Sequence, residues 1–237
     1  TRFYYYGSAS DYVFNGDPAN DSTNVNTGKQ YIDSEKVLVH RVGNTSQIDL
    51  SMGDVHYVIG GFDLQSDYIN GQPDTVLYGI HRATNIGVFV QDQMTFSDRL
   101  TLTAGLRYDY YSIKGTFMEG NVNPKIAAVY QCSPKVSVRS LLARAFRNPS
   151  ISERYTKFEQ GGGLKFTTSP LLRAEKLTLS AEVGTKINLN QIRFDVALYY
   201  NNYKDLIYYE QRQTPDGSLL FEVVNLNKAI LQGFEVS

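Results

Sequence analysis

The sequence of 237 residues contains a single cysteine and no tryptophan, and it lacks long runs of apolar residues. A single cysteine excludes an intrachain disulfide framework. No segment approaches the ~20 consecutive apolar residues of a membrane-spanning helix, which excludes membrane crossing by helices. Basic and acidic residues are balanced at 23 against 24, without the basic excess typical of nucleic-acid-binding proteins, so we expect no nucleic-acid partner.

The opening residues, 1–4, include neither an initiator methionine nor the charged and then apolar segment of a signal peptide. We therefore expect the chain to be part of a longer protein. Charged residues make up only 20% of the sequence, below the ~25% of an average soluble domain. Tyrosine (18) and phenylalanine (12) are abundant instead.

Apolar and polar residues alternate over several long segments. Between Leu100 and Tyr111 one set of alternate residues is apolar or aromatic and the other is mostly polar, and residues 176–187 and 192–201 repeat this pattern. Successive side chains of a strand point to opposite faces, so each segment has one apolar and one polar wall. The segments are as long as the ~9–11 residues of a membrane-spanning strand. Less regular strands are expected at 37–42, 55–64 and 136–146.

The connections between these strands alternate in length. We expect short ones near 52–54, 97–99, 132–135 and 188–190, longer ones near 15–32, 70–83, 114–123 and 147–173, and a compact turn at 214–217. All seven prolines are predicted at strand starts or between strands, because proline cannot donate to a ladder.

Tight turns at one end of a sheet and long loops at the other are typical of an outer-membrane β-barrel. A soluble β-sandwich is the alternative, but its strands are shorter and its turns come every ~8–12 residues. The predicted fold is all-β, a partial transmembrane antiparallel β-barrel of about ten strands in a single domain over 1–237.

Six segments together resemble the barrel of TonB-dependent outer-membrane receptors, and the resemblance is better over 84–237 than over 1–83. They are Gly87–Gln93, Leu100–Asp109, Asn123–Ala127, Ala143–Ser150, Glu153–Tyr155 and Tyr203–Ile207.

The resemblance implies a 22-stranded barrel with an N-terminal plug, in the outer membrane of a Gram-negative bacterium. It implies active uptake of a scarce nutrient, energised by the TonB complex through the plug. A ferric siderophore is the first expectation for the ligand; cobalamin, haem or a glycan is the alternative, and a passive porin is a further one. The sequence shows neither a plug nor a closing strand, so we expect a middle portion of the barrel. We expect outer-membrane lipid around it, no cofactor and no enzymatic activity.

The segment 147–173 carries the main site prediction. Ser150 and Glu153 have the spacing of a capping box at the start of a short helix. Arginines and a tyrosine cluster around it in the sequence, and arginine forks recognise anionic groups bidentately. They are predicted to contact ligand or plug, and the alternative is that they pair with carboxylates of the barrel interior. The residues are Arg144, Arg147, Arg154 and Tyr155.

Tyrosines gather toward the loop ends of the predicted strands. The outward ones are predicted to form an interfacial girdle, whereas Tyr111, Tyr199 and Tyr203 have the inward parity and are candidates for ligand contact.

The remaining candidate residues show no pattern that indicates a catalytic or metal-binding site. His81 is predicted in an outer loop, within reach of ligand, and His40 and His56 in exposed loops; their spacing suits neither metal binding nor catalysis. Residues 161–163 are three glycines without the Lys-Ser/Thr of a phosphate loop, and are predicted as a loop tip. Cys132 is predicted as an inert thiol in a short turn.

Overall fold

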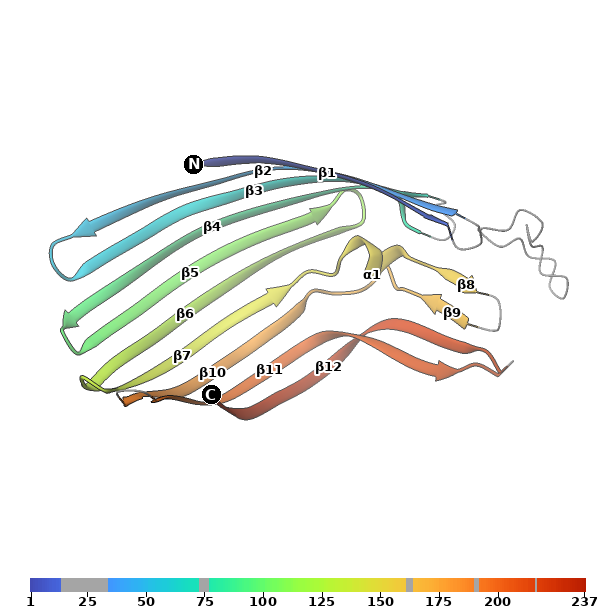
Figure 1. Ribbon diagram of the computed structural model, residues 1–237. Coiled ribbons are helices and arrows are strands. Elements are labelled where there is room, and N and C mark those ends of the chain that lie inside the picture. Colours follow the sequence, from blue (N-terminus) through green and yellow to red (C-terminus); the bar gives the residue numbers. More distant parts are fainter. Residues whose placement is uncertain (14–33, 73–76, 161–163, 190–191, 216) are drawn as a thin grey trace, which may run out of the picture.

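The computed structural model describes residues 1–13, 34–72, 77–160, 164–189, 192–215 and 217–237. These residues form one curved sheet in the order β1-β2-β3-β4-β5-β6-β7-β10-β11-β12-β9-β8 (Figure 1). All pairings are antiparallel except that of β9 with β12. No helix among the described residues combines the length and the apolar character needed to cross a membrane. The elements are β1 (Arg2–Val13), β2 (Ser34–Met52), β3 (His56–Gln72), β4 (Gly79–Ser97), β5 (Leu100–Ile113), β6 (Phe117–Ser133), β7 (Val136–Arg147), α1 (Ile151–Tyr155), β8 (Phe158–Gln160), β9 (Leu164–Thr167), β10 (Glu175–Leu189), β11 (Ile192–Gln213) and β12 (Leu219–Val236).

Ten of these strands are long, as the sequence predicted, and β8 and β9 are two short additions within the described residues. The short turns β2–β3, β4–β5 and β6–β7 gather at one end of the sheet (the left in Figure 1). The segment between β7 and β10, with α1, β8 and β9, lies toward the opposite, loop end. The predicted loop at 15–32 and the glycines 161–163 lie outside the described residues.

Two of the predicted long connections are wrong. Residues 117–123 belong to β6, which pairs with β5 from Phe117 opposite Ile113, so the connection is a tight turn with Gly115 at φ 80°. The connection predicted at 70–83 is shorter, because β3 continues to Gln72 and β4 begins at Gly79. Glycines and asparagines in both segments masked the strand signal, which depends on apolar alternation.

The proline prediction fails at Pro124, which lies inside β6 opposite Leu106. Pairing of β6 with β7 begins only at Lys125, opposite Ala143. Pro124 therefore lies where the ladder on that side has already stopped, and its missing N–H leaves no ladder bond unmade. Residues 117–124 of β6 and 144–147 of β7 therefore do not pair with each other, and a seam separates the two strands toward the loop end.

The sheet has two chemically different walls. The outer wall carries apolar side chains that stay exposed, such as Val90 (50%), Leu106 (50%) and Leu198 (62%). Leu179 and Val196 are also exposed, by 40% and 38%, so they do not converge on a shared core. The predicted oily exterior is confirmed, and the buried clusters among the described residues lie at the loop end.

The inner wall carries ion pairs that run across the strands. Arg107 Nη1 lies 2.7 Å from Asp63 Oδ2, and Arg107 Nη2 lies 2.7 Å from Asp109 Oδ1. Its guanidinium also lies over Gly87, where a Cβ would come within 2.1 Å of Nη2. Only glycine leaves room for this cross-strand bridge. Similar pairs join Arg41 to Asp67 and Arg139 to Glu182 and Asp195.

The lipid contact predicted for the outer wall can be tested on β4. Val90→Arg in the full-length protein is expected to lower the free energy of unfolding in lipid vesicles by about 2 kcal/mol, because a guanidinium would have to enter the hydrocarbon. Gln93→Arg is the matched control, since Gln93 is exposed on the inner wall of the same strand. Denaturant unfolding of the two variants measures the difference. Equal stability would mean that the outer wall faces water.

Candidate functional site at the loop end

The segment 148–174 forms a shelf at the loop end, which we call the loop-end shelf. It contains α1, β8 and β9 and connects β7 to β10. Ser150 caps α1: its Oγ accepts from the Glu153 N–H at 3.1 Å, and Glu153 Oε2 accepts from the Ser150 N–H at 2.8 Å. The predicted capping box is confirmed. Since α1 has only five residues, tertiary contacts must hold it in place.

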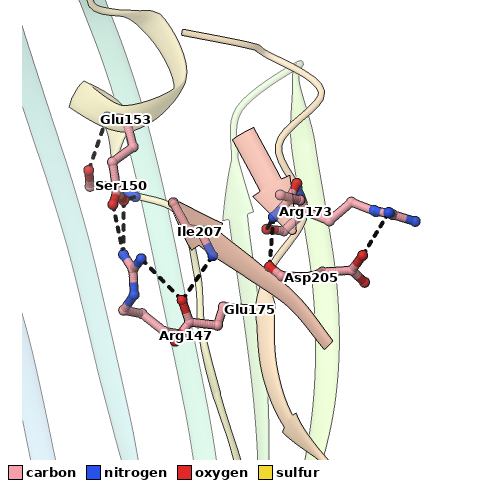
Figure 2. A network of polar contacts seen from close by, with 8 residues as sticks. Arg147, Ser150, Glu153, Arg173, Glu175, Asp205 and Ile207 are labelled. Carbon is pink, nitrogen blue, oxygen red and sulfur yellow. Dashed lines mark hydrogen bonds and ion pairs between the residues drawn. The ribbon is translucent and has the colours of Figure 1, made fainter. Parts of the chain in front are cut away.

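Arg147 ties the shelf to three strands, β7, β10 and β11 (Figure 2). Its Nη1 donates to both carboxylate oxygens of Glu153, at 3.0 and 2.9 Å, and its Nη2 donates to Glu175 Oε2 at 3.4 Å. Glu175 Oε2 also accepts from the Ile207 N–H at 3.1 Å. The last residue of β7 and the first of β10 are thereby joined to β11 through one charge network.

The pKa of Glu153 reflects two opposing influences. Burial raises the pKa of its carboxyl, but hydrogen bonds from Arg147 and Ser150 outweigh burial and bring the pKa below its ordinary value. A carboxyl with a lowered folded pKa stabilises the folded state above its unfolded pKa, and this stabilisation is lost as the pH falls through the folded value.

The stability of α1 should therefore depend on pH and decrease in acid. We expect hydrogen exchange of residues 150–156 to accelerate as the pH falls below about 4, after correction for intrinsic exchange rates. Glu153→Gln should flatten this dependence, because no charge remains to be neutralised. Exchange mass spectrometry of the full-length protein measures both. A corrected exchange rate that is constant between pH 6 and 3 would contradict the role of Glu153.

Arg154 is the innermost charge of the shelf and is only 2% exposed. Its guanidinium donates to the carbonyl oxygens of Pro170 and Leu172, so it joins α1 to the returning part of the shelf. Its Cζ lies 4.4 Å from the ring centre of Phe117. Cation–π contact and two carbonyl acceptors replace the water that this charge gives up.

An aromatic cluster packs α1 against the inner wall. The rings of Tyr155 and His81 are stacked with centres 4.1 Å apart. Tyr155 also donates from its hydroxyl to Thr116 Oγ1 at 2.6 Å. Ile151 is buried against Ala83 and Ile113, with Tyr111 packed beside them. Strands β4 and β5 thus provide the floor on which α1 lies.

The returning part of the shelf is fixed to β11 and β12. Leu172 is buried against Ile207 and Val223. Arg173 Nη2 lies 2.7 Å from Asp205 Oδ1 (Figure 2). Asn225 Nδ2 donates to the carbonyl oxygens of Arg173 at 3.1 Å and Asp205 at 2.7 Å. Asp205 has φ 56°, a left-handed conformation that asparagine, aspartate and glycine tolerate best.

The structure brings five of the eight predicted site residues together. They are His81, Tyr111, Arg147, Arg154 and Tyr155. The location of His81 was wrong, because it lies in β4 and not in an outer loop. Because His81 pairs with Ile69 of β3, β4 begins earlier in the chain than the polar residues of this segment suggested.

The other three predicted residues lie apart from this cluster. Arg144 is not part of it, contrary to the sequence prediction. It shares its face of β7 with Leu142, which is 50% exposed on the outer wall, whereas Arg147 lies on the opposite face. Arg144 lines a cavity of about 510 Å³ at the β6–β7 seam, together with Phe146 and Lys125. Tyr199 and Tyr203 lie on β11, opposite Gly233 and Ala229 of β12.

The other histidines also lie in strands and not in loops. His40 of β2 shares a hydrogen bond of 2.7 Å with Tyr5, and His56 of β3 lies 2.7 Å from Asp92. Cys132 lies at the end of β6 rather than in a turn, and it is exposed. Among the described residues, no group of three or more His, Cys, Asp or Glu side chains could hold a metal ion.

The sequence did not predict the contacts that fix the returning part of the shelf to β11 and β12. Arg173 and Glu175 contact residues that are distant in the sequence, Asp205 and Arg147 respectively. Asp205 lies within the quoted segment Tyr203–Ile207, which was the one available signal. The ion pairs of the inner wall were equally hidden, although alternation placed their residues on the polar wall.

The complete chain, residues 1–237, matches the sequence family described as TonB dependent receptor-like, beta-barrel. The ferrienterobactin receptor of Escherichia coli strain K12 is 25% identical over 182 residues, which cover 71% of this chain and 24% of that receptor. This chain therefore spans about a quarter of that curated relative.

Solved structures share the fold at low identity. A mutant of the ferric enterobactin receptor PfeA of Pseudomonas aeruginosa has a TM-score of 0.71 at 15% identity, over 99% of this chain and 37% of that one. The siderophore receptor PirA of the same organism has a TM-score of 0.70 at 20% identity, over 86% and 39%. The hemophore receptor HasR of Serratia marcescens has a TM-score of 0.66 at 17% identity, over 86% and 39%.

Proposed function

The chain belongs to the TonB-dependent receptor family, in its β-barrel part, and on that premise we propose that its protein takes up a ferric siderophore across the outer membrane of a Gram-negative bacterium. The observation that carries the choice of ligand is the 25% identity with the ferrienterobactin receptor over 71% of the chain. The two walls support the placement, because an oily exterior and an ion-paired interior suit a barrel in lipid.

The loop-end shelf is the proposed ligand-contacting surface. Arg147, at the base of the shelf, and Arg173, within it, have side chains that are 46% and 61% exposed. Ferric siderophores hold iron through oxygen donors and many are anionic, so arginine forks beside aromatic rings match them in charge and in apolar surface. Tyr155, His81 and Tyr111 are among the aromatic side chains of the same cluster.

The buried part of the shelf has a different proposed role. Arg154 is occupied by carbonyl acceptors and aromatic rings, so we assign it the positioning of α1 rather than direct ligand contact. Tyr199 and Tyr203 lie farther along the inner wall and are proposed to meet ligand or plug after capture. Transport would require a plug and the energised TonB complex, as in the family.

The proposal is tested by growth and uptake with the full-length gene. It should be expressed in a Gram-negative strain that lacks its own siderophore receptors and is starved of iron. Single ferric siderophores should restore growth and the uptake of radiolabelled iron, and deletion of the TonB gene should abolish both. Haem and cobalamin are supplied in parallel arms. Rescue by one of them alone would replace the siderophore assignment, and uptake independent of TonB would indicate a passive pore.

A further inference from the structure

The cavity of about 510 Å³ at the β6–β7 seam has a size that suits a ligand, because small-molecule sites usually measure about 300–1,000 Å³. Most of its lining belongs to the inner wall. The register of the sheet places these residues in two neighbouring rows that run across the strands from β4 toward β7. One row contains Gln91, Gly105, Lys125 and Ala143, and the next contains Phe89, Arg107 and Asn123.

The polar side chains of this inner-wall lining are already paired with one another. Lys125 Nζ donates to Gln91 Oε1 at 2.6 Å. Arg107 Nη2 lies 2.7 Å from Asp109 Oδ1, and Asn123 Nδ2 donates to Asp109 Oδ2 at 3.3 Å. Since these groups satisfy one another, the surface that the cavity leaves for a ligand is mainly apolar.

The apolar part of the lining comes from both walls, because the β6–β7 ladder stops at Ala143. Beyond it, Ala145 lines the cavity from the inner wall and Phe146 lines it from the outer wall. Val90 and Leu106 are outer-wall residues of the same lining. A continuous ladder would separate the two walls, whereas the seam lets the cavity extend from the barrel interior toward the apolar exterior.

The cavity adjoins the loop-end shelf. Arg147, whose side chain is 46% exposed, directly follows Phe146 of the lining in β7. The shelf then crosses the loop end of the seam, because Tyr155 of α1 donates to Thr116 in the β5–β6 turn at 2.6 Å. A ligand whose charged head lies on the shelf therefore has the cavity beside it.

We propose that this cavity holds the fatty acyl chain of an amphiphilic ferric siderophore whose iron-binding head lies on the loop-end shelf. The inference rests on the proposed function and names a narrower class of ligand for the same site. Each methylene that moves from water into apolar surroundings strengthens binding about fourfold. The large share of inner-wall residues in the lining favours a ligand that arrives from the barrel interior over a lipid of the surrounding membrane.

The test compares the binding of two ferric probes to the full-length receptor in detergent. Both have a linear tris-catecholate head, which is anionic and aromatic and so suits the arginines and rings of the shelf. One probe carries a dodecanoyl chain on its amine, and the other carries an acetyl group. The parent is expected to bind the dodecanoyl probe at least about 60-fold more tightly, which corresponds to about three buried methylenes. Equal affinities would refute the proposal.

Two variants fill the cavity. Ala145→Phe should lower the affinity for the dodecanoyl probe to that for the acetyl probe, which should not change. Ala143→Leu, farther from Arg147 on the same strand, should act in the same direction, so that a disturbed shelf cannot account for the loss. The matched control is Ala127→Phe, on the inner wall of β6 and outside the cavity lining, which should keep the preference of the parent. Detergent takes up the acyl chain equally in every titration.

Three outcomes would contradict the assignment. An unchanged preference in Ala145→Phe, or an equal loss in Ala127→Phe, would mean that the chain binds elsewhere. Free dodecanoate that competes at the same concentration as the dodecanoyl probe would mean that the cavity is a general fatty-acid site. A failure of the proposed function is visible separately: the parent would then bind neither probe, whereas failure of this inference alone leaves both probes bound with one affinity.

Discussion

Arg154→Ala is expected to release the loop-end shelf and to weaken ferric siderophore binding by the full-length receptor at least about tenfold. The buried guanidinium donates to the carbonyl oxygens of Pro170 and Leu172. Charge-assisted hydrogen bonds contribute about 1.5–3 kcal/mol each, so alanine removes about 3–6 kcal/mol of local stability and leaves buried carbonyls unpaired. The ring of Phe117 also loses its cation.

Hydrogen exchange over 150–156 and 168–174 measures the release, and titration with ferric siderophore measures affinity. Arg154→Lys should give an intermediate result, because an ammonium group keeps the charge but cannot fork between two carbonyls. Lys157→Ala, an exposed change in the same segment, is the control and should resemble the parent. Unchanged exchange in Arg154→Ala would refute the anchoring role. Faster hydrogen exchange in Arg154→Ala with an unchanged affinity for ferric siderophore would instead mean that the shelf does not take part in ligand binding.

Arg107→Ala is expected to be the most destabilising change on the inner wall, at about 3–5 kcal/mol. The side chain of Asp109 is only 6% exposed and would keep a buried charge without its partner. Asp63 would lose the same guanidinium, and the Phe89 ring would lose the cation that lies 5.6 Å from its centre. Denaturant unfolding of the full-length barrel in lipid vesicles measures the loss.

A second variant separates the lost pair from lost packing. Arg107→Ala/Asp109→Asn removes the guanidinium and the buried carboxylate together. It should recover a large part of the stability, because the carboxylate that remains, that of Asp63, is 29% exposed and can be solvated by water. Arg139→Ala is a useful comparison: its partners Glu182 and Asp195 are 35% and 34% exposed, so water can solvate them and the loss should be smaller. Equal losses at Arg107 and Arg139 would show that burial of the carboxylate does not set the cost.

The strands with strict alternation could be predicted because one face of each strand carries apolar side chains and the other face carries polar ones. From Leu100 to Tyr111 each position follows the parity of the sheet, and β5 occupies 100–113. The predictions failed where local sequence is ambiguous. Gly120 and Asn121 read as loop residues, yet pairing with β5 holds them in β6, and tertiary pairing outweighs weak intrinsic preference.

The site was only partly predictable for a related reason. The capping box of Ser150 and Glu153 is a local motif, so its spacing in the sequence was enough to identify it. The role of Arg154 depends on carbonyls 16 and 18 positions away, and no local pattern encodes that contact. Arg144 shows the converse, since its neighbours in sequence suggested a cluster that the parity of β7 rules out.

The sequence by itself determined that this chain forms long amphipathic strands with an oily and a charged wall, because alternation is a property of each strand alone. It also determined the family, through segments that keep their order and spacing. Only the tertiary structure decided which charges meet and how the loop-end shelf is anchored. Those contacts depend on the register between strands, which hydrogen bonds and packing across the sheet establish and which no single strand specifies.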